Sequence, residues 1–146
     1  MSLKGENMEG LDESKDNKEN IIIYIGSTTF SIEKDIISLS KVLSASFTND
    51  TEIKLENISI EDFNIILEFM KLFHTNPKED IGKNFSIFQD TTDWRNEWIK
   101  TKEKKVDIIL TYSHYYDIHS LFDLCTSYIA YTIRQKSMEE LTELLQ

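Results

Sequence analysis

The sequence predicts an α+β domain in which helices cover a small three-stranded sheet and also make up the second half of the chain. An apolar, β-branched run at residues 21–25 is followed by a two-residue turn and a second extended segment. A short strand pattern follows at residues 51–55, and nearly all later periodicity is helical. Because three short strands cannot form a whole core, we expect the helices to supply most of the buried area.

The first elements follow a polar N-terminus. Residues 1–20 are dominated by charge, Asn and Gly and hold no apolar run of signal-peptide length, so we expect a flexible tail. Residues 21–25 and 28–32 are the two strands of a predicted β-hairpin. Gly26-Ser27 forms its turn, with glycine at the first turn position.

The middle of the chain changes from strands to a long helix. A helical stretch after the hairpin is expected to bend or break at residues 38–40, before the strand at 51–55. From Ser59, a plausible cap, apolar side chains recur at helical spacing on two stripes, which indicates a largely enclosed helix. Pro77 ends the pattern within a variable linker, which we place at residues 75–92.

The C-terminal half reads as successive helices. Trp94 and Trp98 are four residues apart, so their indoles share one face of a short amphipathic helix at 93–101. Two longer helices follow at 106–116 and 118–135.

The junctions of these helices carry capping signals. Asp117 is suited to cap the helix at 118–135. Ser137 and Glu140 have capping-box spacing, so residues 136–146 are expected to begin a separate last helix, as the start of an incomplete extension.

Charge and cysteine content restrict the partners and the compartment. The formal net charge is −10, from 26 acidic and 16 basic side chains, and this field repels a phosphate backbone. We therefore expect no nucleic-acid partner. Every apolar run is interrupted before membrane-spanning length, so we expect no membrane partner either. The single cysteine, Cys125, excludes an intramolecular disulfide and fits the cytoplasm or nucleus. The one basic cluster, at residues 100–105, is either a solvated helix junction or a docking spot for an acidic surface.

The sequence offers no constellation for catalysis. His114 and His119 are five residues apart, which separates them by about 140° on one continuous helix, against about 40° for helical zinc ligands. Cys125 lies on a core stripe, and the four glycines form no phosphate-binding loop. We therefore expect no catalytic residue, cofactor or metal, and a protein that is not an enzyme.

The predicted helix at 118–135 carries more apolar surface than one core contact requires. One stripe suits the core, and a second stripe lies about 100° away at Leu124, Tyr128 and Tyr131. The second stripe either packs under the last helix or forms a partner-binding groove with aromatic anchors. Tyr112, Tyr115 and Tyr116 leave the same two alternatives open, as half-buried core or as binding anchors.

Three segments resemble one protein family. Residues 93–99 (DWRNEWI) resemble its tryptophan, acidic, then aromatic-leucine helix, and residues 115–123 (YYDIHSLFD) resemble its asparagine-tyrosine-leucine-aspartate-isoleucine turn. Residues 133–141 (IRQKSMEEL) look like its basic patch and threonine-proline-glutamate-glutamate cap. Their order and spacing, from residue 21 to the end, resemble the Skp family of S-phase kinase-associated adaptors.

The resemblance implies a BTB/POZ fold over residues 21–135 and a non-catalytic adaptor. Such a protein links a cullin scaffold to F-box substrate receptors in an SCF-type ubiquitin ligase, for ubiquitin-dependent degradation, with a weak homodimer when the F-box partner is absent. Residues 136–146 would begin the F-box-binding extension. The implied contacts to the cullin N-terminal domain are Trp98, Ile99, Lys100, His114 and Tyr115. The implied F-box contacts are Leu121, Leu124, Tyr128, Tyr131, Leu141 and Leu145.

The sequence departs from the family pattern at three points. His114 stands where the family usually has asparagine, Gln135 and Met138 replace glycine and proline, and the family continues into two further helices. Other hypotheses are an elongin-C-like adaptor, which normally ends soon after the segment resembling residues 115–118, and a BTB module that assembles with itself.

Overall fold

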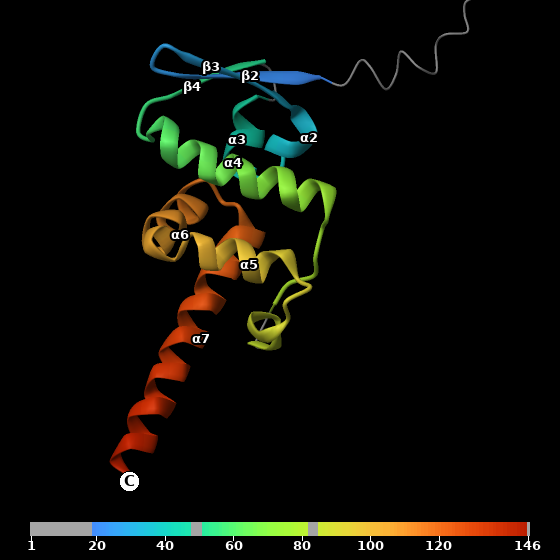
Figure 1. Cartoon of the computed structure of the whole chain (residues 1–146). Helices are drawn as coiled ribbons and strands as arrows, with labels where there is room; N and C mark the ends of the chain where they lie inside the picture. Colours follow the sequence, from blue (N-terminus) through green and yellow to red (C-terminus); the bar gives the residue numbers. More distant parts are fainter. Residues whose placement is uncertain (1–18, 48–50, 82–84, 146) are drawn as a thin grey trace, which may run out of the picture.

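The described part of the chain is arranged in layers (Figure 1). The structure is a computed structural model and describes residues 19–47, 51–81 and 85–145. In chain order the elements are β2 (Asn20–Ile25), β3 (Thr28–Glu33), α2 (Lys34–Ile37), α3 (Lys41–Ser46), β4 (Glu52–Leu55), α4 (Ile60–Thr75), the 3₁₀ helix η1 (Phe85–Gln89), α5 (Trp94–Thr101), the 3₁₀ helix η2 (Glu103–Lys105), α6 (Val106–Tyr115) and α7 (His119–Leu144). The sheet lies over the helices α2, α3 and α4. Helices α5 and α6 lie below α4, and α7 projects away from the rest of the molecule. The α+β prediction is confirmed.

The sheet is built around its first strand. The order is β3-β2-β4, with β2 antiparallel to β3 and parallel to β4. Alternate β2 side chains are buried, namely Ile21, Ile23 and Ile25, which orients this face toward the helices. Gly26 has φ +60°, a region that glycine adopts without a steric penalty, so the predicted hairpin is confirmed.

The parallel connection between β2 and β4 runs through α2 and α3. The break between these two helices falls at residues 38–40, as predicted. Ser40 is fully buried at this break, and its side chain accepts a hydrogen bond from the Leu43 backbone N–H at 3.1 Å. The serine therefore begins α3 by satisfying one of its free donors.

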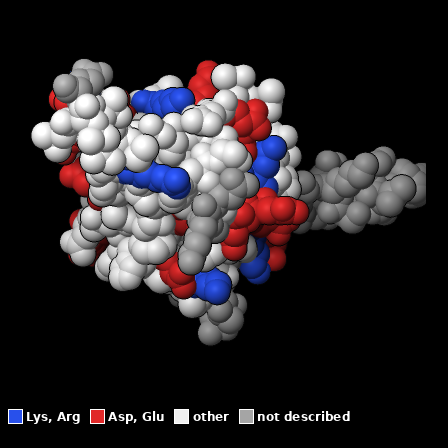
Figure 2. Space-filling view, turned by 90° about the horizontal axis from the view of Figure 1, so that it is seen from below, with Lys and Arg blue, Asp and Glu red and all other residues white. Residues whose placement is uncertain are grey.

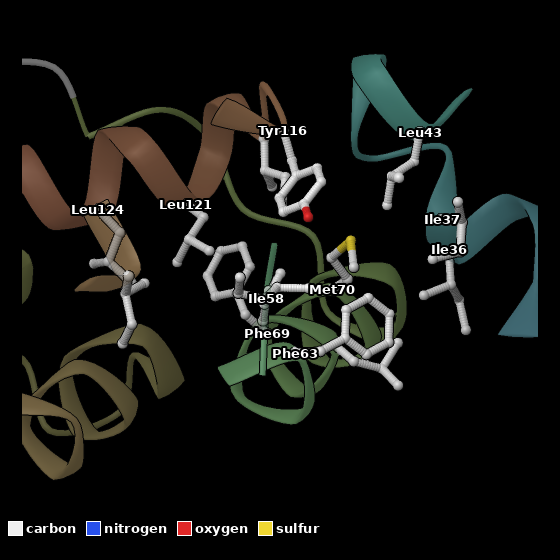
Figure 3. Close-up of a cluster of buried hydrophobic side chains, with 14 of the residues drawn as sticks. Ile36, Ile37, Leu43, Ile58, Phe63, Phe69, Met70, Tyr116, Leu121 and Leu124 are labelled. Carbon is white, nitrogen blue, oxygen red and sulfur yellow. The ribbon is translucent and has the colours of Figure 1, made fainter. Parts of the chain in front are cut away.

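Helix α4 is the centre of the core. It begins where Ser59 accepts a hydrogen bond from the Asp62 N–H at 3.0 Å, which confirms the predicted cap. Its two apolar stripes face different neighbours. In Figure 3, Phe63, Phe69 and Met70 lie between the side chains of α2 and α3 on one side and those of α7 on the other. This arrangement explains why the helix is apolar on more than one face.

The tryptophan helix packs against α4 as the sequence predicts. Asp93 accepts a hydrogen bond from the Arg95 N–H and so caps α5. The Trp94 and Trp98 rings lie 5.5 Å and 5.3 Å from the Phe69 ring, centroid to centroid. The two indoles therefore share one face, and that face closes the core beneath α4.

The prediction that Asp117 caps α7 is wrong. Asp117 has φ 51°, the left-handed region that Asp tolerates better than most residues. It forms the sharp turn between α6 and α7, and the N-terminal cap position of α7 is Ile118, which makes no side-chain capping bond.

The prediction of a separate last helix is also wrong. Helix α7 runs without interruption from His119 to Leu144 and so continues through Ser137. The capping-box spacing at Ser137 is a local signal that takes effect only where the backbone has left the helix. Its neighbours here are mostly good helix formers, so nothing ends the helix before residue 138.

The predicted tail and linker are only partly described. Within the tail assigned to residues 1–20, only Glu19 and Asn20 are described, and Asn20 already belongs to β2. Helix α4 ends at Thr75, two residues before Pro77. The described part of the linker contains η1, whose Phe88 is almost fully buried, so this segment is more than a connection.

Candidate protein-docking surfaces

The last part of α7 is the largest exposed apolar feature of the described chain. From Thr132 to Leu145 every residue is exposed, and the helix extends beyond the other elements (Figure 1). Five large apolar side chains in this stretch are each 50% to 83% exposed: Ile133, Met138, Leu141, Leu144 and Leu145. At 100° per residue they fall within an arc of about 140°, so they form one face, which we call the α7 ridge.

A hollow opens at the base of the α7 ridge, between η1 and α7. Its volume is about 580 Å³. Phe85, Ser86 and Gln89 line it from η1, and Tyr131, Arg134, Gln135 and Met138 line it from α7. Met138 belongs to both the ridge and the hollow, so the two are continuous. The view from below in Figure 2 shows uncharged atoms over much of this end of the molecule, with acidic side chains gathered mainly to one side.

The second stripe of α7 is covered by the chain's own linker. Leu124 is fully buried and Tyr128 is 7% exposed, while Tyr131 is half-buried. Phe88 of η1 lies 5.5 Å from the Tyr128 ring and 5.1 Å from the Tyr131 ring. The stripe therefore packs neither under a last helix nor as an open groove. Its two tyrosines pack against η1, an arrangement that periodicity along α7 alone does not reveal.

The six predicted F-box contacts consequently fall into two groups. Leu121, Leu124 and Tyr128 are core residues and do not belong to the exposed surface. Tyr131 lines the hollow, and Leu141 and Leu145 lie on the α7 ridge. The structure places the accessible apolar surface further along α7 than the sequence stripe suggests.

Tyr128 also fixes α7 to η2. Its hydroxyl donates a hydrogen bond to the Glu103 carboxylate at 2.6 Å. Burial raises the pKa of Tyr128 to about 12, and the hydrogen bond to Glu103 adds to the shift. The phenol therefore stays protonated and keeps donating at any physiological pH.

A second candidate surface, lined by both apolar and polar side chains, lies beside β4, near the end of α6. A groove of about 320 Å³ is bordered by Val42 and Ser46 of α3, Ile53 and Leu55 of β4, and Tyr115 and Tyr116. Tyr115 is 59% exposed and Val42 is 40% exposed. We call this surface the Tyr115 groove. In Figure 1, α3 and β4 lie at the opposite end of the molecule from the free end of α7.

The neighbouring residue Tyr116 holds the end of α6, and with it Tyr115, in place. Tyr116 packs edge-on against the Tyr115 ring at 4.9 Å and is itself buried. The Tyr116 carbonyl accepts hydrogen bonds from the Ser40 hydroxyl at 2.6 Å and from the Val42 N–H at 3.3 Å. Burial raises the pKa of Tyr116 to about 12, with further contributions from Tyr115 and Tyr112. The end of α6 is thus tied to α3.

The predicted cullin contacts also divide by burial. Lys100, His114 and Tyr115 are exposed, and the last two are neighbours at the end of α6. Trp98 and Ile99 are buried on α5. The Trp98 indole N–H donates to the Glu68 carboxylate at 2.6 Å, which joins α5 to α4.

A buried ion pair that the sequence reading missed fixes the linker to α5. Arg95 and Asp93 are both nearly inaccessible and lie 3.0 Å apart, and Arg95 also donates to the Glu79 carbonyl at 2.8 Å. Burial opposes ionisation of Asp93, but the hydrogen bonds from Arg95 outweigh it and hold the pKa of Asp93 below its usual value. The Asp-x-Arg spacing at a helix start was the available signal.

Potentially reactive groups do not converge in the described ranges. Cys125 is fully buried, and burial raises the pKa of its thiol to about 12. His119 lies 3.3 Å from Asp80, and the His114 ring lies 5.7 Å from the Phe122 ring. Among the described residues, no three His, Cys, Asp or Glu side chains are grouped as a metal site would require. Within the same residues, none of the helices has the length and apolar character to cross a bilayer.

Comparison with known proteins identifies the fold. No protein-family model matches the sequence, and no curated protein matches it. Among solved structures, the BTB domain of zebrafish PATZ1 is similar, with a TM-score of 0.50 and 16% sequence identity. The alignment covers 88% of this chain and 98% of that domain. The chain therefore has an α+β fold of the BTB type, as the sequence predicted.

Proposed function

We propose that this protein is a non-catalytic adaptor that links a cullin scaffold to an F-box substrate receptor in an SCF-type ubiquitin ligase of the cytoplasm and nucleus. One observation supports this proposal most directly. Two separate surfaces, the α7 ridge and the Tyr115 groove, lie at opposite ends of the described molecule, and each carries exposed apolar side chains. An adaptor needs two such surfaces so that one partner does not exclude the other.

The α7 ridge is suited to an amphipathic helix. Its five exposed apolar side chains form one face, and the hollow at its base can receive an anchoring side chain. Helices that dock in this way bury apolar side chains at one face, each worth about 1.5–3 kcal/mol when fully enclosed. We assign the F-box partner here, with direct contacts at Tyr131, Leu141 and Leu145. Leu121, Leu124 and Tyr128 would support this surface from beneath.

The Tyr115 groove is the surface that we assign to the cullin N-terminal domain. Tyr115 is a large, partly apolar ring held rigidly by its contact with Tyr116, as is typical of binding anchors. His114 beside it adds a polar group. Trp98 and Ile99 contribute only by fixing α5, whereas Lys100 is exposed and its ammonium donates to the Phe88 carbonyl at 3.4 Å.

Self-association is the second candidate, as in a homo-oligomerising BTB module. The exposure of Leu144 and Leu145 favours it, because two copies of the α7 ridge could cover each other. Light scattering across a concentration series distinguishes the two functions. A monomer or weak dimer that becomes a one-to-one complex with an F-box domain supports the adaptor, and a stable oligomer supports the alternative.

Binary titrations test the assignment of each surface. A purified F-box domain and a cullin N-terminal domain are titrated separately into the wild-type chain, L141S and Y115A. The proposal expects L141S to lose F-box binding alone and Y115A to lose cullin binding alone. E143Q, an exposed change on the same part of α7, is the control. Wild-type protein that binds neither domain would contradict the proposal.

A further inference from the structure

The 3₁₀ helix η1 lies on the part of α7 that would otherwise prolong the docking surface. Phe88 covers the Tyr128 and Tyr131 rings, and Phe85 lies 6.3 Å from the Tyr131 ring. Phe88 is almost fully buried by this packing, whereas Phe85 remains half-exposed at the edge. The contact between the two elements thus includes ring packing, which an incoming apolar side chain can replace.

The covered and uncovered parts of α7 form one stripe. Leu124, Tyr128, Tyr131, Met138 and Leu145 follow at intervals of four, three, seven and seven residues, within an arc of about 100°. Of these residues, Tyr128 and Tyr131 lie against η1. The helix η1 also forms one wall of the hollow, so a helix bound along the α7 ridge would point its next side chains at the edge of η1.

Besides the 3.4 Å bond from Lys100 Nζ to the Phe88 carbonyl, hydrogen bonds on either side of η1 hold the linker in place. On one side the Asp123 carboxylate accepts from the Ile81 N–H at 2.8 Å, and on the other Asn96 donates to the Asp90 carbonyl at 3.0 Å. These anchors would remain if the rings left α7. The second anchor is imperfect, because the buried Asn96 Oδ1 has no hydrogen-bond partner among the described residues, which favours local rearrangement.

We propose that η1 is a strap that regulates this docking surface by competing with the partner helix for α7. In the free protein the Phe85 and Phe88 rings pack against the tyrosine rings of α7. A helix that binds the α7 ridge displaces them and extends its contact onto Tyr131 and Tyr128. This inference rests on the proposed function of the ridge. The strap lowers the apparent affinity, because only the fraction of molecules with η1 displaced offers the full surface.

Substitution of Phe85 distinguishes a strap from a fixed wall of the binding site. The F-box domain is titrated into wild type, F85A, F73A and L141S. Loss of the Phe85 ring contact should tighten binding about 2- to 12-fold. F73A is the matched control, since it removes a half-buried ring that stacks on Phe69, away from α7. Its affinity should equal that of wild type, and L141S should bind much more weakly.

The other outcomes separate the two proposals. If F85A weakens binding as L141S does, η1 is a wall and the strap is overturned, while the adaptor function stands. If wild type does not bind the F-box domain, the adaptor function fails. Whether η1 covers an apolar part of α7 is then tested in the free protein. A strap then requires F85A, but not F73A, to bind more of the apolar dye bis-ANS while unfolding in one transition. Equal dye binding by F85A and wild type overturns the strap.

Discussion

The Phe88 ring of the linker lies 5.1 Å from the Tyr131 ring of α7, with an angle of 32° between the ring planes. This contact brings residues 43 positions apart in the chain together. It also decides which part of α7 is accessible, because Tyr128 becomes interior whereas Tyr131 stays half-buried where the exposed apolar surface begins. The following predictions test that division between core and docking surface.

The first prediction concerns stability along α7. L124A removes a fully buried side chain and should lower the free energy of unfolding by about 2–5 kcal/mol. L144A changes a side chain that is 83% exposed and should alter it by less than about 0.5 kcal/mol. Urea unfolding followed by circular dichroism measures both. Similar effects of the two substitutions would contradict the assignment of Leu124 to the core.

The second prediction concerns Ser40, which joins α3 to the end of α6. S40A removes both the cap of α3 and the donor to the Tyr116 carbonyl, and should cost about 1–3 kcal/mol of unfolding free energy. It should also weaken cullin binding, because Tyr115 loses part of its support, and leave F-box binding unchanged. S44A, a half-buried serine of the same helix that does not line the Tyr115 groove, is the control. Equal loss of both partners would indicate a general defect.

The third prediction is a pH dependence from Asp93. Its pKa is lowered in the folded state, so the Asp93–Arg95 pair stabilises the protein above the unfolded-state pKa, about 3.9 for aspartate. That contribution is lost as the pH falls through the lower folded-state pKa. The difference in unfolding free energy between wild type and D93N should therefore be largest near pH 6 and shrink below pH 4. A difference that grows toward acid would contradict the lowered pKa.

The fourth prediction concerns Cys125. Its thiol is fully buried, and burial raises its pKa to about 12, so little thiolate exists at pH 8. A thiol reagent such as DTNB should react with the native protein only as fast as α7 opens, and immediately in urea. Rapid reaction of the native protein would show that the core around Cys125 is accessible.

Local signals in the sequence were sufficient for much of the fold. The turn at Gly26, the cap at Ser59 and the shared face of Trp94 and Trp98 each depend on neighbouring residues or on one helical period. Such features can be recognised without tertiary information. The α+β class follows from the order of these elements, whereas the BTB-type fold was predicted from the resemblance of three segments to one family.

The features that sequence reasoning missed depend on contacts between distant segments. Phe85 and Phe88 look like isolated apolar residues of a linker until they meet Tyr131 across the fold. The capping-box spacing at Ser137 has no effect inside a continuing helix, and Asp117 adopts a left-handed turn instead of a cap. The candidate surface was therefore predicted on the right helix but partly at positions that the core occupies.

Formation of a ternary complex tests the central claim most directly. The chain is mixed with one F-box domain and one cullin N-terminal domain, and the molar mass is measured by light scattering after size-exclusion chromatography. Two independent docking surfaces predict a one-to-one-to-one complex, from which L141S removes only the F-box domain and Y115A only the cullin domain. Mutual exclusion of the two domains, or full complex formation by both variants, would contradict the claim that these surfaces make the protein an adaptor.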